Sequence, residues 1–181
     1  MLPGDSFDER LLRWVDEHRL GWLNSFSIHL LHLSEASWFW MTAALVGLAA
    51  VIYLRAWRVG LAAVLAGNAS GFTASLLKEH FERARPSFPD ALIQVAGYAM
   101  PSSHAAFTMA PSIALLIVVV WRSRRAFVLA AAGLGSALLL VGGTMIYLGA
   151  HWATDVFAGW VLGILIGVVV GLLLRPRSRR A

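Results

Sequence analysis

The sequence contains no cysteine, which excludes disulfide bridges and thiolate metal sites. It also contains little charge. Of its 181 residues 14% are charged and 59% are hydrophobic, whereas soluble domains are about a quarter charged and about half apolar. Residues 1–19 carry too many charges for a signal peptide, and they lack an apolar core followed by small residues. These features predict a single membrane domain, residues 1–181, that inserts through internal spans.

Five apolar segments approach the length of about 20 residues that crosses the hydrocarbon core of a bilayer. They cover residues 37–54, 59–77, 104–121, 126–149 and 152–174. Polar side chains interrupt residues 1–33, where we expect an interfacial amphipathic helix leading into a partial span, or else a sixth full crossing. The predicted fold class is therefore all-α, an integral-membrane helical bundle with five full transmembrane helices plus the N-terminal amphipathic or sixth helix.

The N-terminal segment carries two helix signals. Ser6 and Glu9 have the spacing of a capping box. An apolar face is predicted to lie opposite a polar face; the first comprises Leu11, Leu12 and Val15, and the second Asp8, Asp16 and Arg19.

The net charge of +5 comes largely from arginines that adjoin the apolar segments. Nine of the fourteen arginines lie in three short stretches, residues 55–58, 122–125 and 175–180. Antiparallel packing would bring these stretches to one face, which the positive-inside rule assigns to the cytoplasm. This distribution differs from a basic groove-binding face, so we expect no nucleic-acid partner.

The opposite face is predicted to collect most of the other polar residues near span ends. They are Lys78, Arg83, Arg85, Ser102, Ser103, His104, His151 and Asp155. Lys78, Arg83 and Arg85 lie on the face that should be poor in cations, so they call for an anionic partner such as phosphate; alternatively, they anchor a helix end at lipid headgroups.

Two further segments contribute histidines to this face. In "MPSSHAAF", Ser102 or Ser103 caps the coming helix, or the helix N-terminus binds an anion beside His104. In "HWATD", His151 and Asp155 share a helical face, where the carboxylate either activates the imidazole or simply pairs with it inside the bundle. A metal site of His104, His151 and Asp155 is disfavoured, because the neighbouring cations would repel a metal ion.

The order of these motifs resembles the type 2 phosphatidic acid phosphatase superfamily, which includes bacterial acid phosphatases and vanadium haloperoxidases. The likeness rests on residues 78–86, 101–104 and 144–155, and it is strongest to the integral-membrane lipid phosphatases. By this resemblance His151 is the nucleophile that forms a phosphohistidine, Asp155 orients it, and His104 protonates the leaving oxygen and then activates water. Phosphate oxygens would be bound by Lys78, Arg85, Ser102 and Ser103. Because these cations and histidines provide positioning and charge for phosphoryl transfer by themselves, we expect no cofactor and no metal.

Two of the motifs depart from the family pattern. Ser103 stands where the family usually has glycine, and Thr144 and Met145 stand where it usually has serine and arginine. One phosphate-binding arginine is therefore missing. We hypothesise that Arg83 or His80 supplies the compensating charge; the alternative is a weakened or non-catalytic member that binds anionic lipid.

The expected function is a membrane lipid phosphatase at the extracytoplasmic face of a bacterial inner membrane. Its substrate would be a lipid phosphomonoester or diphosphate of the undecaprenyl diphosphate, phosphatidylglycerol phosphate or phosphatidic acid type. Transfer of the phosphoryl group to another lipid remains an alternative.

Overall fold

The computed structural model describes residues 6–35, 41, 45, 47–49, 51–53, 55–87 and 91–176. The helices within this part of the chain are α1 (Phe7–Glu17), α2 (Gly21–Glu35), α4 (Trp57–Phe81), α5 (Ser103–Val118), α6 (Arg124–Tyr147) and α7 (Ala153–Leu174). The described residues contain helices and no strands, which agrees with the predicted all-α class. Most of the predicted first span, residues 37–54, lies outside them.

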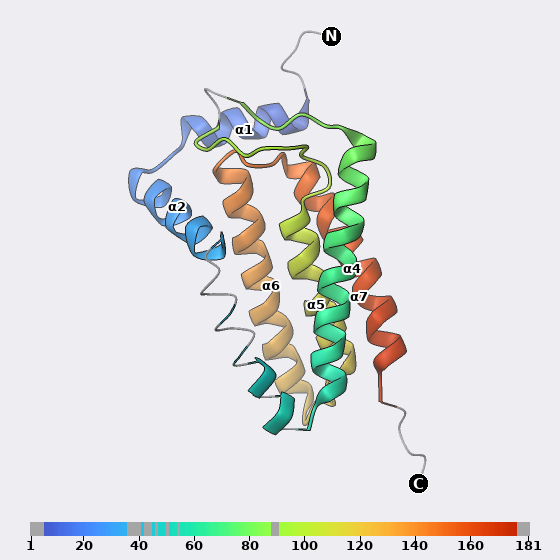
Figure 1. The fold of residues 1–181 in the computed structure, drawn as a ribbon. Coiled ribbons are helices and arrows are strands. Elements are labelled where there is room, and N and C mark those ends of the chain that lie inside the picture. The colour runs from blue at the N-terminus through green and yellow to red at the C-terminus, as the bar shows by residue number, and fades with distance from the viewer. Residues whose placement is uncertain are drawn as a thin grey trace.

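Four helices run alongside one another, and α1 lies across one end of them (Figure 1). At that end α4 and α6 finish while α5 and α7 begin. Four helix ends and the two connections between them therefore lie at the level of α1, which brings segments distant in sequence to one rim of the bundle.

Three of these helices, α4, α6 and α7, are long and apolar enough to cross a membrane. Their bounds lie within four residues of the predicted spans at 59–77, 126–149 and 152–174. The predicted span at 104–121 corresponds to α5, an apolar helix of 16 residues that contains Pro111. The predicted total of five crossings stays untested.

Small residues bring α5 and α7 into close contact. On α7, Gly163 lies so near α5 that a Cβ atom there would be 2.6 Å from the Cβ of Met109. A Cβ on Gly159 would lie 2.5 Å from the carbonyl oxygen of Ser102. Small residues allow such approach between membrane helices. The contact fixes the start of α5 beside the start of α7.

The helix α1 begins with the predicted capping box. The hydroxyl of Ser6 accepts the Glu9 N–H, and the Glu9 carboxylate accepts the Ser6 N–H, both at 3.3 Å. The predicted assignment of faces is wrong for Asp8, which is only 6% exposed and buried alongside Leu12. Residues four apart lie on the same face of a helix, so Asp8 follows Leu12 inward.

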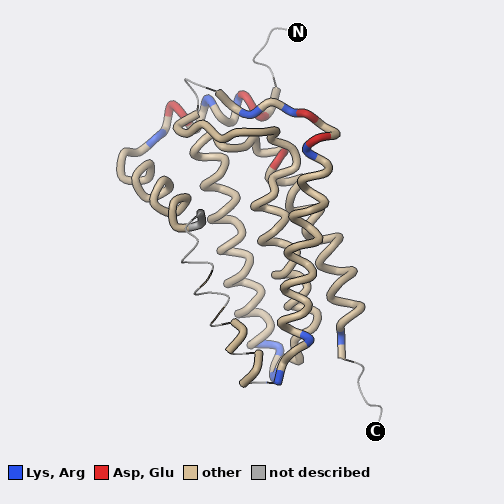
Figure 2. The backbone as a smooth tube through the Cα atoms, viewed as in Figure 1, with Lys and Arg blue, Asp and Glu red and all other residues tan. Residues whose placement is uncertain are grey.

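Charged residues divide between the two ends of the molecule (Figure 2). The lower end carries arginines from the start of α4, the connection between α5 and α6, and the end of α7. The acidic residues drawn in red lie at the end that α1 covers. Within the described residues, the arginine stretches thus share one end of the bundle, as the sequence predicts.

Candidate functional site

His151 is placed by the turn that ends α6. Gly149 adopts a positive φ of 71°, and the N–H groups of Gly149 and Ala150 donate to the carbonyls of Ile146 and Met145 at 3.0 Å. This is the Schellman arrangement that closes a helix at a glycine. It turns the chain back toward the bundle, so that His151 is only 3% exposed.

Asp155 lies in the first turn of α7 and is fully buried. Its Oδ2 accepts the backbone N–H of Trp152 at 2.9 Å and lies 3.6 Å from Nδ1 of His151. The other ring nitrogen of His151, Nε2, lies 3.0 Å from Nη1 of Arg85. A guanidinium only donates hydrogen bonds, so Nε2 must present its lone pair and the ring proton belongs on Nδ1, facing Asp155.

Two cations reach the site from the end of α4. The helix stops at Glu82, whose φ of 45° is left-handed, and the chain then leads to Arg85. The Arg85 guanidinium donates to the carbonyls of Gly97 at 3.0 Å and Ala150 at 2.7 Å. Nζ of Lys78 donates to the carbonyl of Tyr98 at 2.8 Å. Loop carbonyls thus hold both cations in place without neutralising their charge.

The start of α5 completes the site. Ser102 is the N-cap: its Oγ accepts the Ala105 N–H at 3.4 Å, while its own N–H donates to the carbonyl of Asp155 at 2.9 Å. Ser103 and His104 follow in the first helical turn, where backbone N–H groups have no intrahelical acceptor.

These segments enclose a cavity of about 170 Å³. The residues that line it are Leu31, Lys78, Arg85, Val95, Ser103, His104, Met145, Ala150 and His151. Five of the predicted site residues therefore share one cavity, with Asp155 behind His151. Met145 occupies the wall where the family pattern has arginine, so that side of the cavity carries no charge.

Arg83 and Ser102 are not among the residues that line this cavity. Ser102 is buried as the cap of α5. Arg83 instead contacts the carboxylates of Asp155 and Asp8. The predicted site omits Asp8, although its spacing from the apolar Leu12 would have indicated a buried carboxylate. His80, the other hypothesised source of charge, is exposed and also absent from the cavity wall.

Burial and neighbouring groups shift the pKa values of His151 and Asp8. Burial lowers the pKa of His151, and the nearby Arg85 and Lys78 lower it further, against the opposing effect of Asp155. Burial alone would raise the pKa of Asp8, but hydrogen bonds from Thr154 and Arg83 outweigh it and hold that pKa below its usual value. The imidazole is therefore neutral near pH 7 and the Asp8 carboxylate is charged.

Residues 55–179 match the sequence profile of the PAP2 superfamily. The chain belongs to the PAP2 superfamily. The matched PAP2 region contains α4 to α7 and the whole cavity apart from Leu31, and it leaves out α1. The resemblance to type 2 phosphatidic acid phosphatases is thus confirmed.

Known PAP2 proteins resemble nearly the whole chain. Phosphatidylglycerophosphatase B of Bacillus subtilis (strain 168) is 29% identical over 172 residues, which are 91% of this chain and 82% of that protein. The crystal structure described as the first transmembrane PAP2 type phosphatidylglycerolphosphate phosphatase from Bacillus subtilis superposes with a TM-score of 0.81 at 27% identity, covering 96% of this chain and 87% of that one.

LpxE of Aquifex aeolicus shares the fold with a TM-score of 0.70 at 22% identity, covering 94% of this chain and 98% of that one. At this identity the likeness concerns the fold alone. The apolar helices and the likeness to the Bacillus subtilis proteins identify the chain as an integral membrane protein.

Proposed function

We propose that this protein is a membrane lipid phosphatase that works through a phosphohistidine at His151. The observation that carries the proposal is the shared cavity, in which Nε2 of His151 lies beside Arg85 and in the same lining as Lys78 and His104. A neutral imidazole nitrogen with its lone pair available is a nucleophile, and two cations and a helix N-terminus favour a phosphate next to it.

In the first step, Nε2 of His151 attacks phosphorus and the bond from phosphorus to the lipid oxygen breaks. For this attack, Arg85 donates to a phosphate oxygen of the bound substrate in place of Nε2, which frees the Nε2 lone pair, and Lys78 and the Ser103 backbone bind the remaining oxygens. His104 gives its proton to the departing lipid oxygen. Asp155 stabilises the positive charge that the phosphorylated ring carries on its Nδ1–H side.

In the second step, His104, now neutral, accepts a proton from water. The hydroxide equivalent attacks phosphorus, the bond to Nε2 breaks, and inorganic phosphate leaves with His151 restored. Each step is an in-line displacement, for which the protein supplies position and charge. These two steps use no metal ion.

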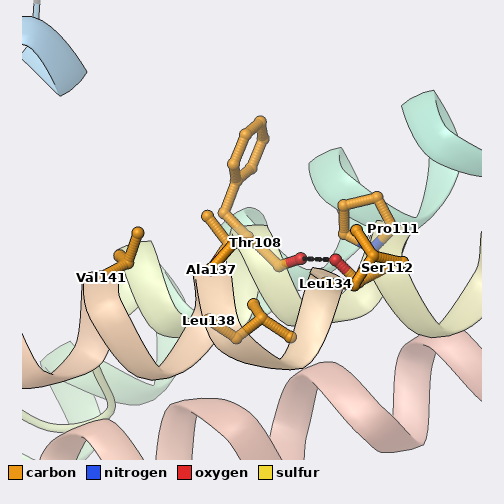
Figure 3. A pocket seen from close by; sticks show the side chains of 8 residues that line it. Thr108, Pro111, Ser112, Leu134, Ala137, Leu138 and Val141 are labelled. Carbon is orange, nitrogen blue, oxygen red and sulfur yellow. Dashed lines mark hydrogen bonds between the residues drawn. The ribbon is translucent and has the colours of Figure 1, made fainter. Parts of the chain in front are cut away.

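A second cavity, of about 240 Å³, supports the proposal that the substrate is a lipid. It lies between α5 and α6, and its lining includes Thr108 and Pro111 of α5 and Leu134 and Leu138 of α6 (Figure 3). Ser112 turns its hydroxyl to the carbonyl of Thr108 at 2.8 Å, so that polar group is satisfied within the helix. Thr108 lies one turn after His104, and an apolar cavity at that depth suits the acyl or prenyl chain next to the phosphate.

The substrate class follows from a phosphate site at the rim of an apolar bundle. Phosphatidylglycerol phosphate is the first candidate, because the relatives in Bacillus subtilis carry its name. Phosphatidic acid and undecaprenyl diphosphate present the same phosphate chemistry. We place the enzyme in a bacterial inner membrane with the site facing outward, since the arginines gather at the other end.

The test is phosphate release from these three lipids in detergent micelles. We expect the wild-type protein to release phosphate from at least one of them, His151→Ala to release none, and the exposed His32→Ala to match the wild type. Denatured wild-type enzyme quenched during turnover of a ³²P-labelled substrate should retain acid-labile, base-stable label that is absent from His151→Ala.

Three results would overturn the proposal. If His151→Ala still releases phosphate, His151 is not the nucleophile. If the wild type releases phosphate from none of the lipids, the non-catalytic alternative is favoured. Label that passes to an added lipid alcohol rather than to water would favour the phosphotransferase alternative.

A further inference from the structure

The N-terminal helix α1 contacts the site through the buried carboxylate of Asp8. Asp8 lies in the first turn of α1, and its Oδ1 accepts the backbone N–H of Thr154 in α7 at 3.0 Å. Its Oδ2 accepts from the Thr154 hydroxyl and from Nη2 of Arg83, the latter at 2.7 Å. Asp8 thus acts as an N-cap for α7 from outside that helix, next to Asp155.

Arg83 links Asp8 to Asp155. Its Nη1 lies 2.6 Å from Oδ1 of Asp155 and 2.6 Å from the hydroxyl of Thr154. Oδ2 of Asp155 meanwhile accepts from Trp152 and faces the ring of His151. Each carboxylate oxygen of Asp155 therefore has its own partner, and the plane of the group is fixed.

The three charged groups Asp8, Arg83 and Asp155 together carry one net negative charge. Arg83 alone would neutralise Asp155 and weaken its pull on the His151 ring. Because Asp8 supplies a second carboxylate, the group Asp8–Arg83–Asp155 carries a net charge of −1 beside an imidazole that becomes positive when it is phosphorylated. Two carboxylates thus hold the guanidinium away from the phosphate cavity, which Arg83 does not line.

We propose that Asp8 and Arg83 are positioning residues for the reaction, with α1 holding Asp155 in its working orientation and charge through Arg83. This inference rests on the proposed function, in which Asp155 orients His151. Asp8 lies outside the matched PAP2 region, which begins at residue 55. It also replaces the hypothesis that Arg83 binds the phosphate.

The kinetic test compares Asp8→Asn with Glu17→Gln, which makes the same change of charge at an exposed position of the same helix. Asp8→Asn should lower kcat on the order of tenfold with KM nearly unchanged, because a group that acts through Asp155 affects the reacting ring rather than substrate binding. Glu17→Gln should match the wild type in both constants.

The pH profile separates positioning from a general loss of structure. The groups that face His151 are Asp155 from α7, Lys78 from α4, Arg85 from the following loop and His104 from α5. Asp8→Asn removes a negative charge behind Asp155, so the acid limb of kcat/KM should move to lower pH. Arg83→Gln removes a positive charge, so the limb should move to higher pH. The double variant should return toward the wild-type profile.

The outcomes are distinguishable from those of the proposed function. If the wild type is active, His151→Ala is inactive, and Asp8→Asn behaves as Glu17→Gln does, the positioning inference alone is overturned. A rise in KM with unchanged kcat in Arg83→Gln would overturn it too, because it would assign Arg83 to phosphate binding. Should Asp8→Asn fail to fold, the opposite shift in Arg83→Gln carries the test.

Discussion

At the scale of single residues, the proton on the His151 ring is controlled by its two neighbours. Arg85 can only donate to Nε2, and the Asp155 carboxylate, which carries no proton to donate, faces Nδ1 at 3.6 Å. A ring with its proton on Nδ1 exposes a lone pair toward the cavity, whereas the opposite tautomer would direct a proton at the incoming phosphorus. Removing Asp155 should therefore impair the chemical step even though His151 remains.

This arrangement predicts the protonation of His151 directly. Burial and the cations Arg85 and Lys78 lower the pKa of the ring below its ordinary value of 6.5. A lowered pKa means that the ring is neutral at pH 7 and becomes protonated only as the pH falls below 6.5. Histidine-selective ¹⁵N NMR in micelles, with His151→Ala to assign the signal, should show an unprotonated Nε2 at pH 7. A midpoint above 6.5, or a protonated Nε2, would contradict this prediction.

At the scale of helices, the register of α5 against α7 sets the distance between the two histidines of the site. Gly159 touches the backbone of Ser102, and Gly163 and Gly167 continue the contact against Met109 and the carbonyl of Ala110. A shift of α7 along this surface would move His151 and Asp155 past His104. Packing in the middle of the bundle is thereby coupled to geometry at its rim.

Gly163→Ala tests this coupling, with Gly133→Ala in α6 as its matched control. A Cβ at Gly163 would lie 2.6 Å from Met109, and none of the surrounding atoms lies within 4 Å of a Cβ at Gly133. Overpacking costs about 1–3 kcal/mol, while an unobstructed Gly→Ala change in a helix stabilises by about 0.5–1 kcal/mol. Thermal unfolding in detergent should show a lower midpoint for Gly163→Ala and an equal or higher one for Gly133→Ala. Equal midpoints for both variants would refute the close contact.

The sequence is sufficient to predict the helices α4 to α7 and the convergence of their ends, because apolar length and antiparallel order determine both. It also predicts the cavity residues Lys78, Arg85 and His104, since each follows or precedes a span at the same rim. It does not predict the partner of Arg83. That depends on where the separate helix α1 docks, and neither periodicity nor spacing encodes that position.

Met145 also shows what the sequence does not predict. Its position in the motif predicts that a cation is missing from the site, and in the structure the apolar Met145 side chain lines the cavity. Arg83, one of the two residues hypothesised to supply the missing charge, instead pairs with two carboxylates. Only the three-dimensional arrangement distinguishes a cation that faces the phosphate from one that lies behind the catalytic carboxylate.

At the scale of the whole molecule, charge separates the two ends of the bundle. The end opposite α1 carries the arginines at the start of α4, in the connection from α5 to α6 and at the end of α7 (Figure 2). The end with α1 mixes both signs and contains the cavity. Arginine-rich connections stay in the cytoplasm, so we expect α1 and the phosphate site on the outer side of the membrane.

Cysteine labelling tests this orientation cleanly, because the natural chain has no cysteine. Ser87→Cys places a thiol at the exposed loop after α4, near the cavity end, and Ser123→Cys places one at the exposed start of α6. A maleimide that cannot cross the membrane should label Ser87→Cys in cells whose inner membrane is intact, and should label Ser123→Cys only after that membrane is permeabilised. The reverse pattern would put the site in the cytoplasm, where it would reach lipid phosphates of the inner leaflet instead of the outer one.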